Sequence, residues 1–215
     1  MKHSSDQSIR ITWLGHACFL LESGGYRILL DPYGDNHVPG YGILRQQAHQ
    51  VLCSHDHGDH NYTEAVSLLP KQPCPFRITA LDTFHDDQQG TLRGTDIIHI
   101  FDNDSLRVAH LGDLGCDPTD AQKETLKGLD AVMIPIGGFY TIDAAQAKKL
   151  VEEIQPKVII PMHYRNGSLG YDVISTLDPF TGAFDTVVEY PGNTLEITPD
   201  TDPHVAVLTY EFPAD

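Results

Sequence analysis

The most informative stretch of this chain is Ser54-His55-Asp56-His57-Gly58-Asp59-His60, which carries three histidines and two aspartates in its last six positions. Alternate side chains of an extended strand share a face, so His55 and His57 can bind one divalent ion. Gly58 allows a sharp bend that presents Asp59 and His60 to a second ion. Imidazole and carboxylate ligands suit zinc, manganese or iron. The pattern therefore predicts a site for two ions roughly 3.5–4 Å apart.

The alternative interpretation of this motif is a histidine-rich surface loop produced by composition alone. The flanking sequence favours the metal site, because the apolar run Val51-Leu52-Cys53 precedes the motif and a helical pattern over residues 61–69 follows it. Asn61 opens that segment, and Glu64 stands three residues later as the second half of a capping pair. We therefore expect the ligands to lie on a rigid corner between a strand and a helix.

Length and charge limit the class of protein. A chain of 215 residues without a Ser/Gly/Pro-rich linker predicts one compact domain over residues 1–215. The 14 basic and 30 acidic residues give a formal charge of −16. Nucleic acid is a poor partner for such a chain, because phosphate contacts need basic patches. We expect a small-molecule substrate, and the sequence does not indicate the oligomeric state.

The sequence also indicates the cellular compartment and the oxidation state of the cysteines. No stretch approaches the roughly 20 apolar residues of a membrane span, and residues 1–7 lack the apolar region of a signal peptide. We therefore expect a cytoplasmic protein that does not bind a membrane. The cysteines form no Cys-x-x-Cys pair, which predicts reduced, mostly buried thiols rather than a disulfide framework: Cys18, Cys53, Cys74 and Cys116.

Hydrophobic patterning predicts a strand-rich first third and alternating helices and strands later. Helices are expected from Thr119 to about Gly128, with Gln122 as capping partner, and from Asp143 to Ile154. Strands are expected at 9–14, 18–22, 26–30, 77–83, 96–101, 106–111, 131–134, 158–160, 186–190, 195–198 and 205–210. The first three should form an antiparallel meander. The pattern predicts two sheets packed face to face, with helices outside.

Two complete sets of metal ligands need more residues than the six-residue stretch from His55 to His60, called the hexad below, supplies. Three polar residues stand where an expected strand meets a loop: His85, Asp113 and His163. Taken singly, each also fits a structural role, as a surface histidine, a turn former between glycines and a strand-end histidine. Together with the hexad, the three favour metal ligation.

Further motifs carry a resemblance to a known family. These are Trp13-Leu14-Gly15-His16-Ala17-Cys18-Phe19, Leu30-Asp31-Pro32, His110-Leu111-Gly112-Asp113-Leu114-Gly115 and Ile136-Gly137-Gly138-Phe139-Tyr140-Thr141. With the hexad, His85 and Met162-His163, the chain resembles the metallo-β-lactamase superfamily from about Ile9 to Tyr164. Within it, the chain is similar to a compact branch of Zn-dependent hydrolases near the ascorbate-6-phosphate lactonase group. The resemblance implies an α/β (α+β) fold, a four-layer αβ/βα sandwich with the site at one edge between the sheets.

The resemblance also implies the role of each ligand. By position in the motifs, His55, His57 and His85 would hold the first ion, Asp59, His60 and His163 the second, and Asp113 would bridge them. We expect Zn²⁺, with Mn²⁺ or Fe as alternatives. His110 is the alternative to His85 in the first shell, although it shares a strand face with Leu106 and Val108, which favours burial behind the ligands.

Other residues are expected near the site or away from it. Asp31 resembles the early aspartate that orients the histidine segment, although a turn residue before Pro32 fits equally. His16 either lines the pocket or satisfies a strand-end hydrogen bond. Five histidines lie in no motif and are expected to be ordinary surface or strand residues: His3, His37, His49, His99 and His204.

The expected chemistry is hydrolysis by a hydroxide that bridges two metal ions, with Asp59 accepting or relaying a proton. A small ester or lactone is favoured over a phosphoester because the chain is acidic. The alternative is a non-hydrolytic diiron redox or oxygen-binding protein, but redox members of the superfamily carry a carboxylate where this chain has His57. A metal-holding scaffold without turnover is a third possibility, which the full ligand set disfavours.

Overall fold

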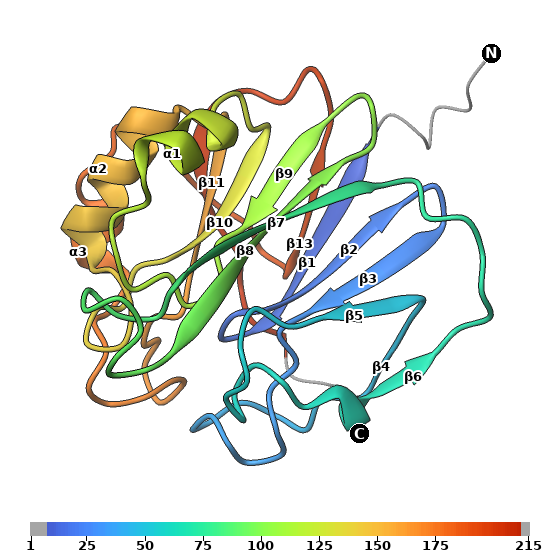
Figure 1. The fold of residues 1–215 in the computed structure, drawn as a ribbon, viewed down its shortest axis with the longest axis horizontal. Coiled ribbons are helices and arrows are strands. Elements are labelled where there is room, and N and C mark those ends of the chain that lie inside the picture. Colours follow the sequence, from blue (N-terminus) through green and yellow to red (C-terminus); the bar gives the residue numbers. More distant parts are fainter. Residues whose placement is uncertain (1–7, 212–215) are drawn as a thin grey trace.

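The computed structural model describes residues 8–211, so His3 and the expected absence of a leader in residues 1–7 lie outside it. Two sheets dominate the structure (Figure 1). The smaller has the order β13-β1-β2-β3-β5, from β1 (Ile9–Gly15), β2 (Cys18–Ser23), β3 (Tyr26–Leu30), β5 (Gln50–Leu52) and β13 (Thr194–Ile197). The antiparallel meander predicted for β1, β2 and β3 is confirmed.

The larger sheet has the order β12-β14-β11-β10-β9-β8-β7. Its strands are β7 (Arg77–Phe84), β8 (Thr95–Asp102), β9 (Arg107–His110), β10 (Ala131–Pro135), β11 (Val158–Met162), β12 (Val187–Glu189) and β14 (His204–Val207). Every residue of the parallel strands β10 and β11 is buried, as continuous apolar runs in a covered sheet require. One apolar core takes side chains from both sheets.

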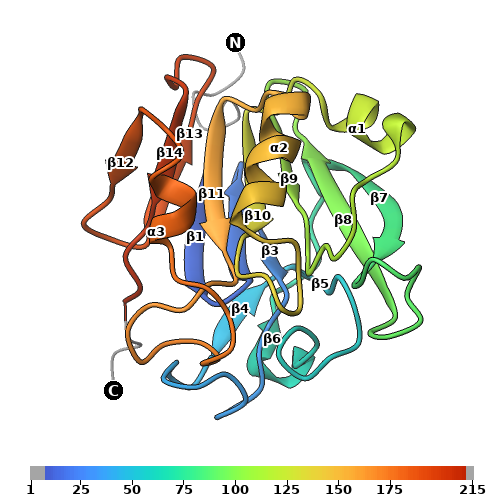
Figure 2. The same cartoon turned by 90° about the vertical axis from the view of Figure 1, so that its left-hand side faces the viewer.

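Three α-helices lie on the outer side of the seven-stranded sheet (Figure 2): α1 (Asp120–Leu126), α2 (Ala144–Ile154) and α3 (Asp178–Thr181). Both predicted helices begin at capping boxes, with Thr119 and Asp143 as the capping residues. Helix α2 buries Ala147, Leu150, Val151 and Ile154, which recur at helical spacing. The predicted α/β sandwich is confirmed.

The helix predicted over residues 61–69 is wrong. This segment forms a single 3-10 turn, η2 (Thr63–Ala65), and the short strand β6 (Val66–Leu68), which pairs in parallel with β4 (Gln46–Ala48). The backbone N–H of Tyr62 donates to the carbonyl of Pro32, 2.8 Å away, which ties the segment to the end of β3. Tyr62, Ala65, Val66 and Leu69 recur at helical spacing, but of these four only Ala65 is buried. That is too little burial to stabilise so short a helix.

Other differences are smaller. Helix α3 and the pair of β4 and β6 were not predicted, and β14 ends at Val207 rather than at residue 210. Beyond β14, the N–H of Thr209 donates to the carbonyl of Gly192, so the backbone leaves the sheet ladder there. Strand β5 joins the parallel edge of β3, with Leu52 beside Leu30. This pairing brings the chain after β5 next to Asp31, which follows β3.

Candidate metal centre

The predicted ligands follow strands of both sheets and meet at one edge of the sandwich. The hexad follows β5, His85 follows β7, Asp113 follows β9 and His163 follows β11. The carboxyl ends of parallel strands meet at the same edge of a sheet, which explains why β9 and β11 deliver their ligands to one place. The structure brings all seven predicted ligands into overlapping clusters. Within each cluster, the potential donor atoms all lie within 4.8 Å of one another.

The first cluster consists of three imidazoles, from His55, His57 and His85. The ring centroids of His55 and His57 lie 4.6 Å apart, and the ring of His85 lies 4.6 Å from His55 and 5.1 Å from His57. His57 faces solvent, whereas His85 is buried. Burial lowers the pKa of His85 to about 4. A neutral imidazole offers a lone pair, so this cluster can bind a cation at neutral pH.

The second cluster contains His16, Asp59, His60 and His163. An oxygen of Asp59 lies 3.4 Å from Nε2 of His16 and 3.7 Å from Nε2 of His60. The rings of His16 and His163 have centroids 4.1 Å apart. Burial, followed by the charge of His163, lowers the pKa of His16 to about 4. His16 was expected at a pocket wall or a strand end, and it lies inside the cluster.

Asp113 joins the two clusters. Its Oδ2 lies 3.2 Å from Nε2 of His60, 3.4 Å from Nε2 of His85 and 3.1 Å from Nε2 of His163. Burial alone would raise the pKa of this carboxyl, but the charges of His163 and His60 lower it well below its ordinary value. An ionised carboxylate at this position can contact cations in both clusters.

Asp31 fixes two histidines of the hexad from behind. It accepts hydrogen bonds from the Ser54 N–H (2.7 Å), the Ser54 hydroxyl (2.6 Å) and Nδ1 of His60 (2.8 Å). Because the Ser54 hydroxyl donates its hydrogen bond to Asp31, its oxygen accepts from Nδ1 of His55 at 2.9 Å. Both rings are thereby protonated on Nδ1, which leaves Nε2 free to bind a metal. Asp31 therefore lies where the resemblance implies.

Unpaired polar atoms test whether metal ions fit here. Within residues 8–211, the buried Nε2 atoms of His16, His55 and His60 and Oδ1 of Asp113 have no hydrogen-bond partner. Leaving such atoms buried and unpaired costs about 1–3 kcal/mol each. Divalent cations would satisfy these atoms with imidazole and carboxylate donors of the usual kind. The residues present fit metal ions at both clusters.

His110 is fully buried behind the site. Its Nε2 donates to the carbonyl of Ala17 at 2.8 Å, and its Nδ1 accepts from the N–H of Gly112 at 3.2 Å. With both nitrogens engaged, the ring has no lone pair for a metal. This geometry supports His85 over His110 as a donor to the first cluster.

Asp96 is a site residue that the sequence analysis missed. It is fully buried on β8, and its Oδ1 accepts from the N–H of Asp113 at 3.0 Å and lies 3.5 Å from Nδ1 of His55. Burial raises its pKa well above the ordinary value. A signal was present in the alternation of β8, because Asp96 shares the buried strand face of Ile98 and Ile100.

A pocket of about 350 Å³ opens over His57, Asp59, His85 and Asp113, within the size range of small-molecule sites. Its other lining side chains are His37, Arg93, Tyr140 and Tyr171. The sequence analysis did not predict these four, and it treated His37 as an ordinary histidine. Tyr171 donates from its hydroxyl to Asp59, 3.2 Å away. Tyr140 stands in the quoted Ile136–Thr141 motif, which was given no role in the site. No motif marks His37, Arg93 or Tyr171, because loops distant in sequence bring them together.

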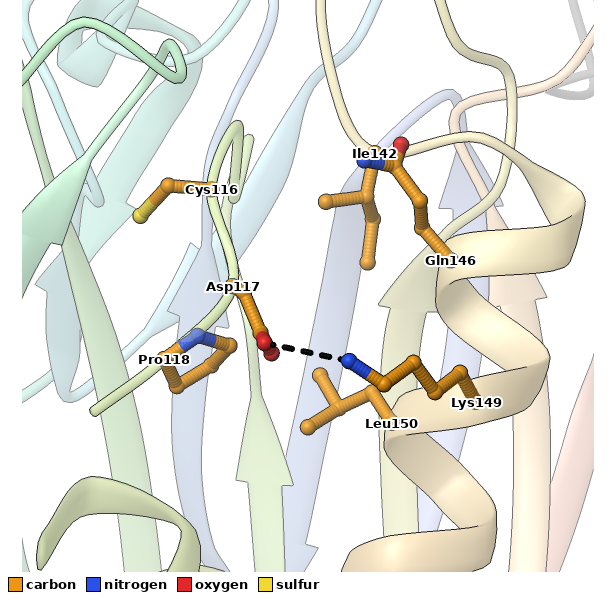
Figure 3. A pocket seen from close by; sticks show the side chains of 7 residues that line it. All are labelled: Cys116, Asp117, Pro118, Ile142, Gln146, Lys149 and Leu150. Atoms are coloured by element: carbon orange, nitrogen blue, oxygen red, sulfur yellow. Dashed lines mark hydrogen bonds and ion pairs between the residues drawn. The ribbon is translucent and has the colours of Figure 1, made fainter. Parts of the chain in front are cut away.

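A second cavity lies between α2 and the loop that follows β9 (Figure 3). It has a volume of about 80 Å³, and the ion pair of Asp117 and Lys149 crosses it at 3.3 Å. Its lining contains Cys116 but no histidine. The cavity is too small for a drug-sized ligand and lacks the donor set of the histidine clusters.

A family model, described as the beta-lactamase superfamily domain, matches residues 10–163. The chain belongs to the metallo-β-lactamase superfamily. This member is 30% identical over 195 residues to a protein of Archaeoglobus fulgidus named as a metal-dependent hydrolase, covering 73% of this chain and 83% of the relative. A relative from Hyperthermus butylicus with the same name is 28% identical, covering 72% of this chain and 82% of the relative.

Solved structures agree with this assignment. A protein of Thermotoga maritima, attributed to the Zn-dependent hydrolases of the metallo-β-lactamase superfamily, superposes with a TM-score of 0.74 and 32% identity. The match covers 94% of this superfamily member and all of the Thermotoga chain. Both the recognised family and the fold that the resemblance implies are confirmed. In residues 8–211, no helix has the length and apolar character needed to cross a membrane.

Proposed function

We propose that this metal-dependent hydrolase works with two divalent ions, expected to be Zn²⁺. In this proposal His55, His57 and His85 hold one ion, Asp59, His60 and His163 hold the other, and Asp113 bridges them. The observation that carries the proposal is the position of Asp113, whose Oδ2 lies 3.1 to 3.4 Å from imidazole nitrogens of both clusters. One carboxylate between two donor sets is suited to a pair of ions.

Divalent ions at these clusters supply Lewis acidity and bring the pKa of a bound water toward neutrality. Asp59 is the residue placed to accept or relay a proton. Burial would raise the pKa of Asp59, but its contact with His16 and the charge of His60 lower it well below the ordinary value. Burial and the charge of Asp59 raise the pKa of the Tyr171 hydroxyl. Tyr171 therefore stays a neutral donor and orients the Asp59 carboxylate.

The pocket supports a small substrate. A volume of about 350 Å³ admits a small ester or lactone, and we favour these bonds over a phosphoester because the chain carries a formal charge of −16. The histidine at position 57 favours hydrolysis over the diiron redox alternative, since an imidazole takes the place of the carboxylate expected in that class.

The test uses one variant in each cluster. We expect His57→Ala and His163→Ala each to lower the bound metal from about two ions to about one per chain. We also expect each to reduce kcat/KM for an activated ester at least 100-fold, because the two ions act together in such sites. Elemental analysis and ester hydrolysis measure both effects.

His204→Ala is the matched control, because His204 is a histidine of β14 whose Nε2 pairs with the hydroxyl of Tyr190. This control should keep both ions and full activity. Retention of two ions and of wild-type turnover by either cluster variant would contradict the proposed ligand set.

A further inference from the structure

Arg93 is a cation that the proposed chemistry does not use. It lines the pocket together with His57 and His85, and it also lines a second cleft that shares His57 with that pocket. Among the described residues that line these two clefts, Arg93 is the single lysine or arginine. Its guanidinium makes no ion pair with any residue between 8 and 211. A half-buried positive charge therefore faces the pocket without a counterion.

Two packed tyrosines, Tyr140 and Tyr171, support the side chain of Arg93. Its guanidinium carbon lies 5.5 Å from the ring centroid of Tyr140, a cation–π contact. Tyr140 packs edge-on against Tyr171 at 5.8 Å, and Tyr171 in turn donates to Asp59. This contact uses none of the N–H donors of the guanidinium, so these groups stay available to a ligand.

The backbone of Arg93 is held by the turn that carries His85. Asp86, the next residue, is buried, and its carboxylate accepts four backbone N–H bonds from the loop. The donors are Gln88 at 2.8 Å, Gly90 at 2.9 Å, Leu92 at 3.0 Å and Arg93 at 2.7 Å. The cation and the proposed ligand His85 thus share one rigid support, which fixes Arg93 relative to the site.

We propose that Arg93 binds an anionic group of the substrate, a carboxylate or a phosphate, while the scissile bond lies over the histidine clusters. This inference rests on the proposed function and adds the substrate class to it. A chain of charge −16 repels anions at long range, so an anionic substrate needs a specific cation in the pocket. The planar guanidinium matches the two oxygens of a carboxylate or phosphate.

The test compares matched aryl esters. Methyl 4-acetoxybenzoate is neutral, 4-acetoxybenzoate carries a carboxylate away from the scissile acetyl bond, and 4-acetoxyphenyl phosphate carries a phosphate in its place. The wild-type protein should prefer the anionic esters, and the preferred anion distinguishes a carboxylate from a phosphate substrate. Loss of a hydrogen bond to a charged group predicts that Arg93→Met lowers kcat/KM for the anionic esters about 10- to 100-fold, mainly through KM.

Two further variants separate charge from shape. Arg93→Lys keeps the charge and should retain part of the preference. Arg77→Met is the matched control, because Arg77 is a 67% exposed arginine at the opposite end of β7 from His85. Arg77→Met should stay within about twofold of wild type for all three esters, and in Arg93→Met the loss for the neutral ester should be smaller than the loss for the anionic esters. Metal content should not change in any of them.

Calorimetric titration with 4-hydroxybenzoate and with inorganic phosphate gives a readout that does not need turnover. The dissociation constant of the preferred anion should rise about 10-fold or more in Arg93→Met. Equal losses for neutral and anionic esters, or unchanged anion binding, would overturn the role of Arg93. If the wild-type protein hydrolyses no ester, the proposed function fails, and the titration alone decides whether Arg93 binds anions.

Discussion

At the scale of single residues, Asp31 shows how one buried carboxylate organises the site. It accepts hydrogen bonds from Ser54 and His60 and adopts a φ of 45°, a left-handed conformation that aspartate tolerates better than most residues. Burial would raise its pKa, but the proximity of His110 and the hydrogen bonds from His60 and Ser54 lower it from 3.8 to about 2. The ionised form is therefore the native form.

Asp31→Asn tests this role. A carboxylate with a lowered pKa in the folded state contributes stability that is present above about pH 4 and is lost as the pH falls toward 2. A shift from 3.8 to about 2 corresponds to about 2 kcal/mol. The free energy of unfolding of the metal-free variant, measured in urea, should lack this part of the pH dependence.

The same variant should bind zinc about 10- to 100-fold more weakly, as expected when the support of a ligating histidine is lost. Competition with a chelator measures this affinity. Asp185→Asn changes an exposed aspartate and should behave like wild type in both experiments. Unaltered zinc affinity in Asp31→Asn would show that Asp31 does not support the hexad.

The sequence allowed prediction of those residues that stand at strand ends within motifs, such as Asp59 and Asp113. Their placement follows from the strand that precedes them, so local patterning suffices. Arg93 and Tyr171 were missed because each reaches the site through a contact across the fold, and such contacts leave no periodic signal in a single sequence. Asp96 does stand in the alternation of β8, but that pattern predicts its burial and not its contact with the site.

At the scale of elements, the loop between β7 and β8 depends on Asp86, the acceptor of four backbone N–H groups. Asp86→Ala should increase hydrogen exchange at the amides of Leu92 and Arg93 about tenfold or more, because hydrogen bonds to a charged acceptor contribute about 1.5–3 kcal/mol each. Exchange mass spectrometry or NMR measures this change. Asp87→Ala is the matched control, since Asp87 is the exposed neighbour. Unchanged exchange in Asp86→Ala would contradict the role of Asp86.

The elements also show where patterning fails. Helix α2 was predicted correctly because four core residues recur at helical spacing and a capping box marks its start. The segment after the hexad has a similar capping signature, yet it forms η2 and β6. Four of its apolar residues stand at helical spacing, but of these only Ala65 is buried, and pairing with β4 satisfies the backbone. A capping signal and a short, half-buried apolar face were insufficient to form a helix.

At the scale of the whole molecule, the predicted sandwich of two sheets is confirmed, whereas the boundary of a single domain over residues 1–215 stays a prediction. The acidic charge of −16, the half-buried carboxylate of Asp59 and the buried carboxylate of Asp113 favour bound cations at this site. Opposite charges in a poorly solvated site attract strongly, so metal ions should bind tightly there.

The most direct measurement is elemental analysis of protein purified without added metal, combined with hydrolysis of 4-nitrophenyl acetate before and after chelation. We predict about two zinc or manganese ions per chain, loss of turnover on chelation and recovery when metal is restored. Protein without bound metal, or turnover that survives complete chelation, would contradict a dinuclear hydrolase. Two iron ions per chain with no turnover would favour the redox alternative.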